Sequence, residues 1–394
     1  MMQEMPDWSE LPHDLLVLIA TRLNLIVDYL IFGTVCNSWH STATKNNFNS
    51  GLPWLMLAEE EDNEGNTFRR FFSLYDGTIL KKRIPKASRK CCMESMDWLI
   101  TVGDDEGEIS LIHPFSDVHI ELPHQNTTLD YDDDHSTDLM TFIRKAVLSA
   151  NPSHTSDYVV MAIERNMKFI SFWRPGDLRW TRVIWEGTQH NLFADLVYFN
   201  GKIYTVSHSG ELLVCDVDDF VGLGGHVIAQ IPFEPQEFVE QLYILESLGS
   251  LFVISRYGVL VRPIEDDCES FPLTLRPDER ELLGDGEFTY GTTDFRVFQV
   301  DLAAGKVTET NELRDMAFFL GANASLSVQA SQFPGIKPNH IYFTDDCFES
   351  YTCYEEGGGL DMGVFNVADG SIQPHYDGVS LSWFCPPIWV TPTL

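Results

Sequence analysis

The chain of 394 residues is short of basic side chains. It has 26 Lys and Arg against 59 Asp and Glu, which gives a formal net charge of −33. Because contacts with phosphate depend on a basic surface, this shortage argues against binding of the whole chain to nucleic acid or to an anionic membrane. Apolar runs such as residues 15–20 are also far shorter than the ~18 residues that a membrane helix needs. We therefore expect neither nucleic acid nor a membrane as a partner.

Cysteines are few and are not spaced for chemistry. The eight cysteines form no C-x-x-C pair and have no H-x-x-x-H companion, which argues against a zinc site or a redox motif. They are expected to be buried thiols in a reducing compartment. The first ten residues carry acids and no basic side chain ahead of an apolar run, so no secretory signal is predicted and a cytoplasmic or nuclear location is expected.

Motifs of catalysis are missing as well. The glycines of residues 222–225 lack the G-x-G-x-x-G spacing, no G-K-S/T follows a glycine cluster, and no G-x-S-x-G occurs. The acids of residues 130–138 alternate as in a calcium loop, but His135 and Thr141 stand where an EF-hand needs Gly and Glu. We interpret Asp345-Asp346 as fixing a turn through local hydrogen bonds rather than as an acid–base pair. The sequence therefore predicts no enzyme, no cofactor and no metal site.

Helical spacing occurs near the start of the chain. Apolar residues recur there at intervals of three and four, which places them on one face of a helix of about three turns. Pro12 suits the first turn of that helix, since its missing N–H would have no partner there. Two or three short helices are predicted, and so small a unit is expected to offer some apolar surface to a partner. The two apolar sets are Leu15, Leu16, Ile19 and Leu23, and then Val27, Leu30, Val35, Cys36 and Trp39.

From residue 52 onward the pattern predicts β-structure. Short runs rich in Val, Ile, Phe, Tyr and Trp are broken by Gly, Asp, Asn and Pro. Units of strand, turn, strand and return strand begin near residues 52, 96, 157, 201, 249 and 339. About six such units favour a β-propeller, whose blades repeat at roughly 40–50 residues, and a pair of β-sandwiches is the alternative. The candidate recognition loops are the insertions at residues 124–138, 263–287 and 345–361.

Two sets of motifs carry a resemblance to a known family. The pattern L-P-x-D-L-L-x-x-I-x-x-R-L, then V-C-x-x-W, between Leu11 and Trp39 resembles the F-box, the helical module that binds the Skp-type adaptor of cullin–RING ubiquitin ligases. Later motifs, among them K-P-N-H-I-Y-F-T-D-D and W-F-C-P-P-I-W-V-T-P, resemble plant F-box proteins with a kelch-like β-propeller, formerly a domain of unknown function. The resemblance implies a mainly β chain with a small helical F-box over residues 8–48 and a propeller of six to seven blades over residues 49–394. The strand near Trp54 would pair with the strand near Trp389 and close the ring.

The resemblance also implies a function. The chain would be a non-catalytic substrate receptor of an SCF-type ubiquitin ligase, whose F-box binds the Skp-type adaptor and, through it, the cullin–RING ligase, while the propeller binds an unidentified protein target. A propeller scaffold with a degenerate F-box that acts outside the cullin complex is the alternative. It is favoured by Ile31, Gly33, Asn37 and His40, which stand where basic residues often occur. The residues expected to contact the adaptor are Leu11, Pro12, Leu15, Ile19, Leu23, Val35 and Trp39.

Positive charge is concentrated in one segment. Eight of the 26 basic residues fall within residues 69–90, where Asp76 is the only acid. The segment is consistent with a docking patch for an acidic partner, or with a nuclear localisation signal in K-K-R-I-P-K-A-S-R-K. We favour a third interpretation, that these charges face outward on a blade and protect its edge. The eight residues are Arg69, Arg70, Lys81, Lys82, Arg83, Lys86, Arg89 and Lys90.

Overall fold

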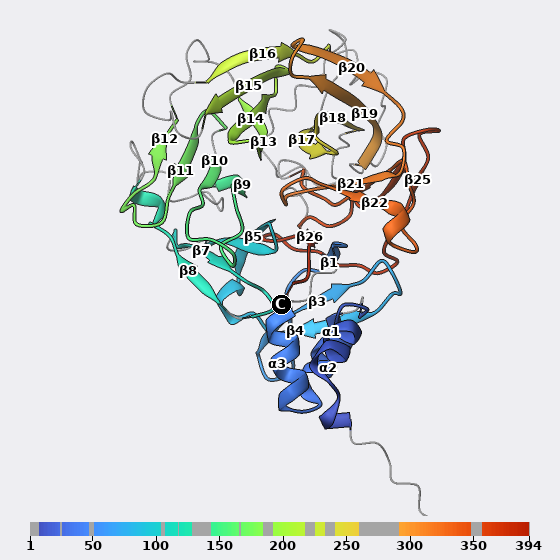
Figure 1. Cartoon of the computed structure of the whole chain (residues 1–394). Coiled ribbons are helices and arrows are strands. Elements are labelled where there is room, and N and C mark those ends of the chain that lie inside the picture. Colours follow the sequence, from blue (N-terminus) through green and yellow to red (C-terminus); the bar gives the residue numbers. More distant parts are fainter. Residues whose placement is uncertain are drawn as a thin grey trace, which may run out of the picture.

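The structure is a computed structural model in which a small helical module lies beside a ring of six β-sheets (Figure 1). It describes residues 8–23, 26–46, 51–103, 107–116, 118–127, 143–164, 167–183, 192–216, 225–232, 241–259, 291–347 and 357–393. The acidic loop with the calcium-like spacing and the insertion at 263–287 therefore lie outside the described residues, as does the middle of the insertion at 345–361.

The helical module contains three α-helices after a single 3₁₀ turn. The first α-helix is shorter than the three turns that its apolar spacing predicts, because it has only eight residues. Pro12 is its N-cap rather than part of its first turn. Thr21 is the C-cap of the helix, and its hydroxyl donates to the carbonyl oxygens of Val17 at 3.0 Å and Leu18 at 3.2 Å. Leu23 therefore lies beyond the end of α1. The elements are η1 (Trp8–Glu10), α1 (His13–Ala20), α2 (Ile26–Thr34) and α3 (Asn37–Asn46).

The ring consists of six antiparallel blades, apart from one parallel pair in the sixth. Blade 1 contains β26 (Ile388–Val390), β1 (Trp54–Met56), β2 (Glu60–Glu61), β3 (Thr67–Phe72) and β4 (Ile79–Lys82). Blade 2 contains β5 (Lys90–Ser95), β6 (Trp98–Gly103), β7 (Ile109–Ile112) and β8 (His119–Glu121). Blade 3 contains β9 (Ile143–Leu148), β10 (Val160–Glu164), β11 (Ile170–Trp173) and β12 (Thr181–Arg182).

The remaining blades complete the circle in chain order (Figure 1). Blade 4 contains β13 (Phe193–Phe199), β14 (Lys202–Ser207), β15 (Glu211–Asp216) and β16 (His226–Gln230). Blade 5 contains β17 (Gln241–Ser247), β18 (Ser250–Val259), β19 (Gly291–Asp301) and β20 (Lys306–Thr310). Blade 6 contains β22 (Leu326–Gln329), β21 (Met316–Leu320), β23 (His340–Phe343), β24 (Gly363–Asn366) and β25 (Ile372–Gln373). Short 3₁₀ turns are η2 (Pro85–Ala87), η3 (Gln125–Thr127) and η6 (Ala330–Gln332).

The prediction of six propeller blades is confirmed, but the predicted units after the first start one element late. The units that were expected to begin at residues 96, 157, 201 and 249 begin instead with β5, β9, β13 and β17, which lie on the inside of the ring (Figure 1). The sixth likewise begins with β21 and β22 rather than at residue 339. An inner strand has the same apolar composition as its neighbours, so composition does not distinguish the strand that opens a blade from the one that closes it.

Ring closure follows the prediction. In β1, Trp54 pairs with Val390 and Leu55 pairs with Trp389 of β26, so the C-terminal strand completes the first blade from the inside. Trp389 is fully buried, and its ring meets Phe319 of blade 6 edge to face at 5.0 Å. The closure removes two sheet edges that would otherwise expose unpaired backbone groups.

The hydrophobic core lies between blades rather than in one central mass. Six clusters of buried side chains fill the six junctions between neighbouring sheets. The cluster between blades 1 and 2 also contains buried residues of the module, such as Leu16 and Phe32, together with Phe71 and Phe115 of the blades. The module thus packs on the rim of the ring beside β3 and β4, outside the circle of blades (Figure 1).

The basic segment at 69–90 does not form one exposed patch. Arg69 is buried, so the prediction that all eight charges face outward is wrong for this residue. Its guanidinium lies 3.8 Å from the sulfur of Cys92. Arg70 and Arg83 pair with Glu60 and Asp62 at 2.5 and 2.9 Å. Arg70 and Arg83 therefore stabilise blade 1 through ion pairs, whereas half of the eight basic residues are exposed, namely Lys81, Arg83, Lys86 and Arg89.

The cysteines of the described residues are free thiols. Cys92, Cys215, Cys347 and Cys385 are buried, as predicted, whereas Cys36 and Cys91 are half-buried.

Candidate functional site

The helical module exposes apolar side chains that its small core does not use. Among the residues predicted to contact the adaptor, Pro12, Leu15 and Val35 are exposed, Leu15 by 45% and Val35 by 50%. The other predicted contacts are half-buried and pack against the cluster shared with blades 1 and 2. These are Leu11, Ile19, Leu23 and Trp39. The structure thus separates a set available to a partner from a set that holds the module together.

Four further apolar residues of the module are exposed and were not among the predicted contacts. Ile31 is 58% exposed and Trp8 59%, and Leu18 and Leu30 are exposed by more than two fifths. Leu18 follows Leu15 by three residues in α1, so the helical spacing could have identified it. Exposed apolar residues at this density on so small a unit indicate a surface that a partner covers.

Polar and aromatic contacts fix α2 and the turn η1 against α3. The hydroxyl of Tyr29 in α2 donates to the carbonyl oxygen of Ala43 in α3 at 2.9 Å. The indole N–H of Trp39 donates to the carbonyl oxygen of Trp8 at 3.0 Å, and its ring packs on Phe32 with 4.6 Å between centroids. The half-buried Trp39 is therefore a structural residue of the module as well as a predicted contact.

Two residues that depart from the F-box pattern have a packing role. A Cβ atom on Gly33 would lie 3.4 Å from the Cβ of Ala43, which is an ordinary van der Waals contact, so Gly33 lies at the contact between α2 and α3. The carbonyl oxygen of Gly33 lies 3.2 Å from Nδ1 of His40 on α3. Ile31 and Asn37 are exposed instead. The exposed positions Ile31 and Asn37 are consequently uncharged where basic residues often occur.

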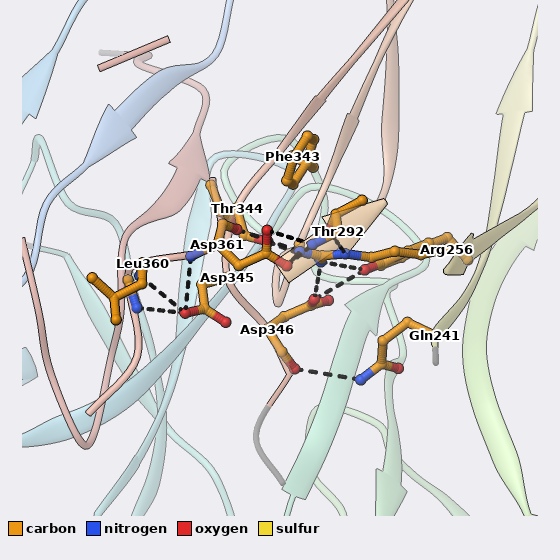
Figure 2. A network of polar contacts seen from close by, with 12 residues as sticks. Gln241, Arg256, Thr292, Phe343, Thr344, Asp345, Asp346, Leu360 and Asp361 are labelled. Carbon is orange, nitrogen blue, oxygen red and sulfur yellow. Dashed lines mark hydrogen bonds and ion pairs between the residues drawn. The ribbon is translucent and has the colours of Figure 1, made fainter. Parts of the chain in front are cut away.

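A buried arginine dominates the polar contacts of blades 5 and 6 (Figure 2). Arg256 of β18 is fully buried, and its two terminal nitrogens lie 2.7 Å from Oδ1 of Asp346 and 2.5 Å from Oδ2 of Asp361. Its Nε donates to the hydroxyl of Thr292 at 2.6 Å, and the hydroxyl of Tyr243 accepts from Nη1 at 3.0 Å. Burial raises the pKa of Tyr243 well above its usual range, so this phenol stays neutral. The network thus pairs one buried cation with two carboxylates.

The same network holds both ends of the insertion at residues 345–361. Oδ2 of Asp345 accepts hydrogen bonds from the backbone N–H of Gly359 at 2.6 Å and of Leu360 at 3.1 Å (Figure 2). The expectation that Asp345-Asp346 makes local turn contacts is therefore wrong: Asp345 reaches across the insertion, and Asp346 pairs with Arg256 on another blade. These contacts are structural and do not form an acid–base site.

A pocket opens at one mouth of the central channel. We call it the axial pocket. It has a volume of about 340 Å³ and lies where the inner strands β5, β9 and β13 end, beside the start of β22 and the residues after β26. Arg256 belongs to the opposite mouth, because it pairs with Gln241 at the start of the inner strand β17. The lining residues that matter below are Glu94, Asp97, Asn151, Leu196, Leu326 and Thr393.

A metal site and a membrane-spanning helix are both absent from the described part of the chain. No group of three His, Cys, Asp or Glu side chains there is arranged to hold a metal ion. No helix within the same residues is long and apolar enough to cross a bilayer.

Comparison with known proteins assigns both parts of the chain. An F-box domain profile matches residues 8–51, and the profile of the KIB1-4 β-propeller matches residues 71–366, which is most of the chain. The chain belongs to the KIB1-4 β-propeller family. F-box proteins are in general non-catalytic adaptor subunits.

Relatives that match nearly the whole chain come from Arabidopsis thaliana. The chain is 25% identical to "F-box protein SKIP23" over 98% of this chain and 96% of that protein, and 25% identical to "Putative F-box protein At5g55150" over 98% and 97%. Among solved structures, the chain is similar to "Structure of YjhT" with 10% identity and a TM-score of 0.38, covering 82% of this chain and 97% of that one. The F-box, the β-propeller and the plant relationship are therefore established.

The close approach of two loops in this KIB1-4 propeller gives a testable expectation. Gly359 has φ +127°, and a Cβ there would lie 2.2 Å from the carbonyl oxygen of Ser380. Gly359→Ala should therefore lower the unfolding free energy by about 2–3 kcal/mol, from strained φ and a backbone collision together. Gly370→Ala is the control, because Gly370 also has positive φ but no atom within 4 Å of its Cβ position. Equal losses in urea unfolding of the two variants would contradict the close contact.

Proposed function

We propose that the chain is the substrate-recognition subunit of an SCF-type E3 ubiquitin ligase. In this proposal the helical module binds the Skp-type adaptor and, through it, the cullin–RING ligase, while the propeller binds the protein that is ubiquitinated. The observation that carries the proposal is the exposed apolar surface of the module, which includes Leu15, Ile31 and Val35. Apolar residues that are exposed together on a protein surface commonly mark a site where a partner binds.

The arrangement of the two parts supports this role. The module is attached to the rim of the ring through its buried residues, and none of its helices lines the axial pocket, so its exposed residues and that pocket lie in different parts of the molecule (Figure 1). A receptor of this kind supplies no catalytic group. It holds target lysines at high effective concentration beside the ubiquitin-charged conjugating enzyme, which makes a bimolecular attack nearly unimolecular.

One observation favours a second candidate, a propeller scaffold that acts outside the cullin complex. Ile31 and Asn37 are exposed at positions where basic residues often support adaptor binding, and Gly33 and His40 are occupied with α2–α3 packing. If adaptor binding requires those charges, the module would serve only as a structural cap on blades 1 and 2.

Co-purification decides between the two candidates. The full chain is expressed with a tagged Skp-type adaptor and a cullin–RING pair, and the purified adaptor is examined for bound chain. The ligase proposal predicts capture of the folded chain together with the cullin. Absence of capture, with a folded chain in the unbound fraction, would transfer support to the scaffold.

A further inference from the structure

The axial pocket contains two carboxyl groups and no cation among its described lining residues. Glu94 is almost completely buried at the end of β5, and its Oε1 accepts the backbone N–H of Asp97 at 2.8 Å. Asp97 is also buried, and its Oδ1 accepts from the side-chain amide of Asn151 at 2.7 Å. No Lys, Arg or His lines the pocket, in contrast to the Arg256 network, where the acids have a buried counter-ion.

Hydrogen-bond directions around Asp97 identify it as an acceptor on both oxygens. The backbone N–H of Ser116 donates to Nδ1 of His113 at 3.1 Å, so the other ring nitrogen of His113 carries the proton and donates to the hydroxyl oxygen of Thr393 at 3.0 Å. The hydroxyl of Thr393 then donates to Oδ2 of Asp97. This chain of donors ends on a carboxylate, which leaves the pocket with negative charge that no described lining residue neutralises.

The remaining walls combine apolar residues with polar ones such as Ser325, Ser327 and Thr391. Leu196 and Val197 of blade 4 and Leu326 of blade 6 lie opposite the acids. On the rim, Met96 is exposed at φ 51°, and Leu248, in the neighbouring β17–β18 turn, is 75% exposed at φ 50°. Both positions favour Asn or Gly, because bulky residues at positive φ are strained. Exposed apolar side chains at such positions form a contact surface around the pocket.

A cationic side chain with a methylene stem fits this environment. Its apolar stem would contact the leucine and valine walls, and its charged end would reach the carboxyl groups, as Lys and Arg do at other boundaries between apolar and charged surface. The rim at Met96 and Leu248 would contact apolar residues on either side of the cation. The net charge of −33 also attracts a basic partner.

We infer that the axial pocket is a recognition site for a protein segment that inserts one Lys or Arg side chain between apolar neighbours. This inference deepens the proposed function and rests on it only for the fate of the bound segment. Binding of the segment is measured without adaptor or cullin, so failure here and failure of adaptor capture are separate results.

The test is a peptide screen with the full chain. Immobilised octapeptides carry each amino acid in turn at one central position between leucines, and bound chain is quantified at pH 8. We expect Lys or Arg at the centre to give the highest binding, and Glu94→Gln to lower the affinity of the best peptide at least tenfold. Glu121→Gln is the matched control, since it makes the same charge change at an exposed site on β8 of the same blade.

Two outcomes of the peptide screen would overturn the inference. One is absence of any preference for a basic centre, and the other is an equal loss of affinity in Glu94→Gln and Glu121→Gln, which would reflect overall acidity alone. A third arm adds spermidine as a competitor. If spermidine binds as tightly as the best peptide, the pocket recognises a small cation and the inference of a protein segment is wrong.

The pH dependence of wild-type binding gives a second test, which does not depend on the folding of a variant. Burial, with the nearby Asp97 charge, raises the pKa of Glu94 from 4.5 to about 8. If the ionised form binds the cation, affinity should rise roughly fivefold between pH 7 and pH 8, as the ionised fraction grows. Two other titratable groups nearby have pKa values outside that range: burial raises the pKa of Asp97 to about 6 and lowers that of His113 to about 4. His154 also lies near Asp97. Binding that is constant between pH 7 and pH 8 would contradict the role of Glu94.

Discussion

Replacement of Arg256 by methionine is expected to lower the free energy of unfolding by about 3–5 kcal/mol. Methionine keeps much of the side-chain volume but removes the cation, and it leaves Asp346 and Asp361 facing each other without a counter-ion. The hydroxyl of Thr292 and the carbonyl oxygen of Thr344 would also lose a donor. Urea unfolding followed by tryptophan fluorescence measures the change.

The design includes a control on the adjacent strand and a rescue. Arg296 of β19 makes a comparable pair with Glu309 at 2.7 Å, but nearly half of the Glu309 side chain is exposed, so Arg296→Met should cost no more than about 1 kcal/mol. Adding Asp346→Asn and Asp361→Asn to Arg256→Met should recover part of the loss, because the stranded charges are removed. Similar stabilities for Arg256→Met and Arg296→Met would show that the buried network does not hold blades 5 and 6 together.

Charged substitutions on the module should abolish adaptor binding while the fold remains intact. Leu15→Glu combined with Val35→Glu places two carboxylates on the exposed apolar surface, where an adaptor would have to desolvate them. We expect the dissociation constant for a Skp-type adaptor to rise about 100-fold or more, since apolar anchor residues commonly contribute 2 kcal/mol or more each. Isothermal titration calorimetry with purified adaptor gives this value directly.

A matched substitution elsewhere separates the interface from general surface charge. Leu178 is 90% exposed in the loop between β11 and β12, away from the module, so Leu178→Glu should leave adaptor affinity unchanged. Thermal melting shows whether each variant is folded. A folded Leu15→Glu, Val35→Glu variant that still binds as tightly as wild type would exclude this surface as the adaptor contact.

Local patterns in the sequence predicted the architecture but not the contacts between blades. The helical spacing after Leu11 and the recurrence of short β-rich units identified the two parts, and the partners Trp54 and Trp389 of the closing sheet were predicted correctly. The inner strands were assigned to the wrong units because every strand of a propeller has similar composition. Register and blade boundaries depend on which strands meet in space.

The buried charges could not be found from the sequence. Arg256 is 90 residues from Asp346 and 105 from Asp361, so nothing in the local pattern links them. Glu94 lies near the end of an ordinary strand, and only the arrangement of five blades around the channel mouth makes it a buried pocket acid. The sequence pattern did not distinguish the exposed adaptor contacts from the inward-packing ones, since all of them are apolar or aromatic. The structure shows that Leu15 and Val35 are exposed, whereas Ile19 and Trp39 pack inward.

Hydrogen exchange of the full chain, with and without a saturating Skp-type adaptor, tests the central claim most directly. Amide exchange reports which backbone segments are protected when a partner binds. The account predicts added protection within residues 8–46, strongest in α1 and α2, and unchanged exchange at both mouths of the propeller channel. Adaptor-dependent protection on a propeller face, or no protection anywhere in a folded chain, would contradict the claim that the helical module connects this propeller to a ubiquitin ligase.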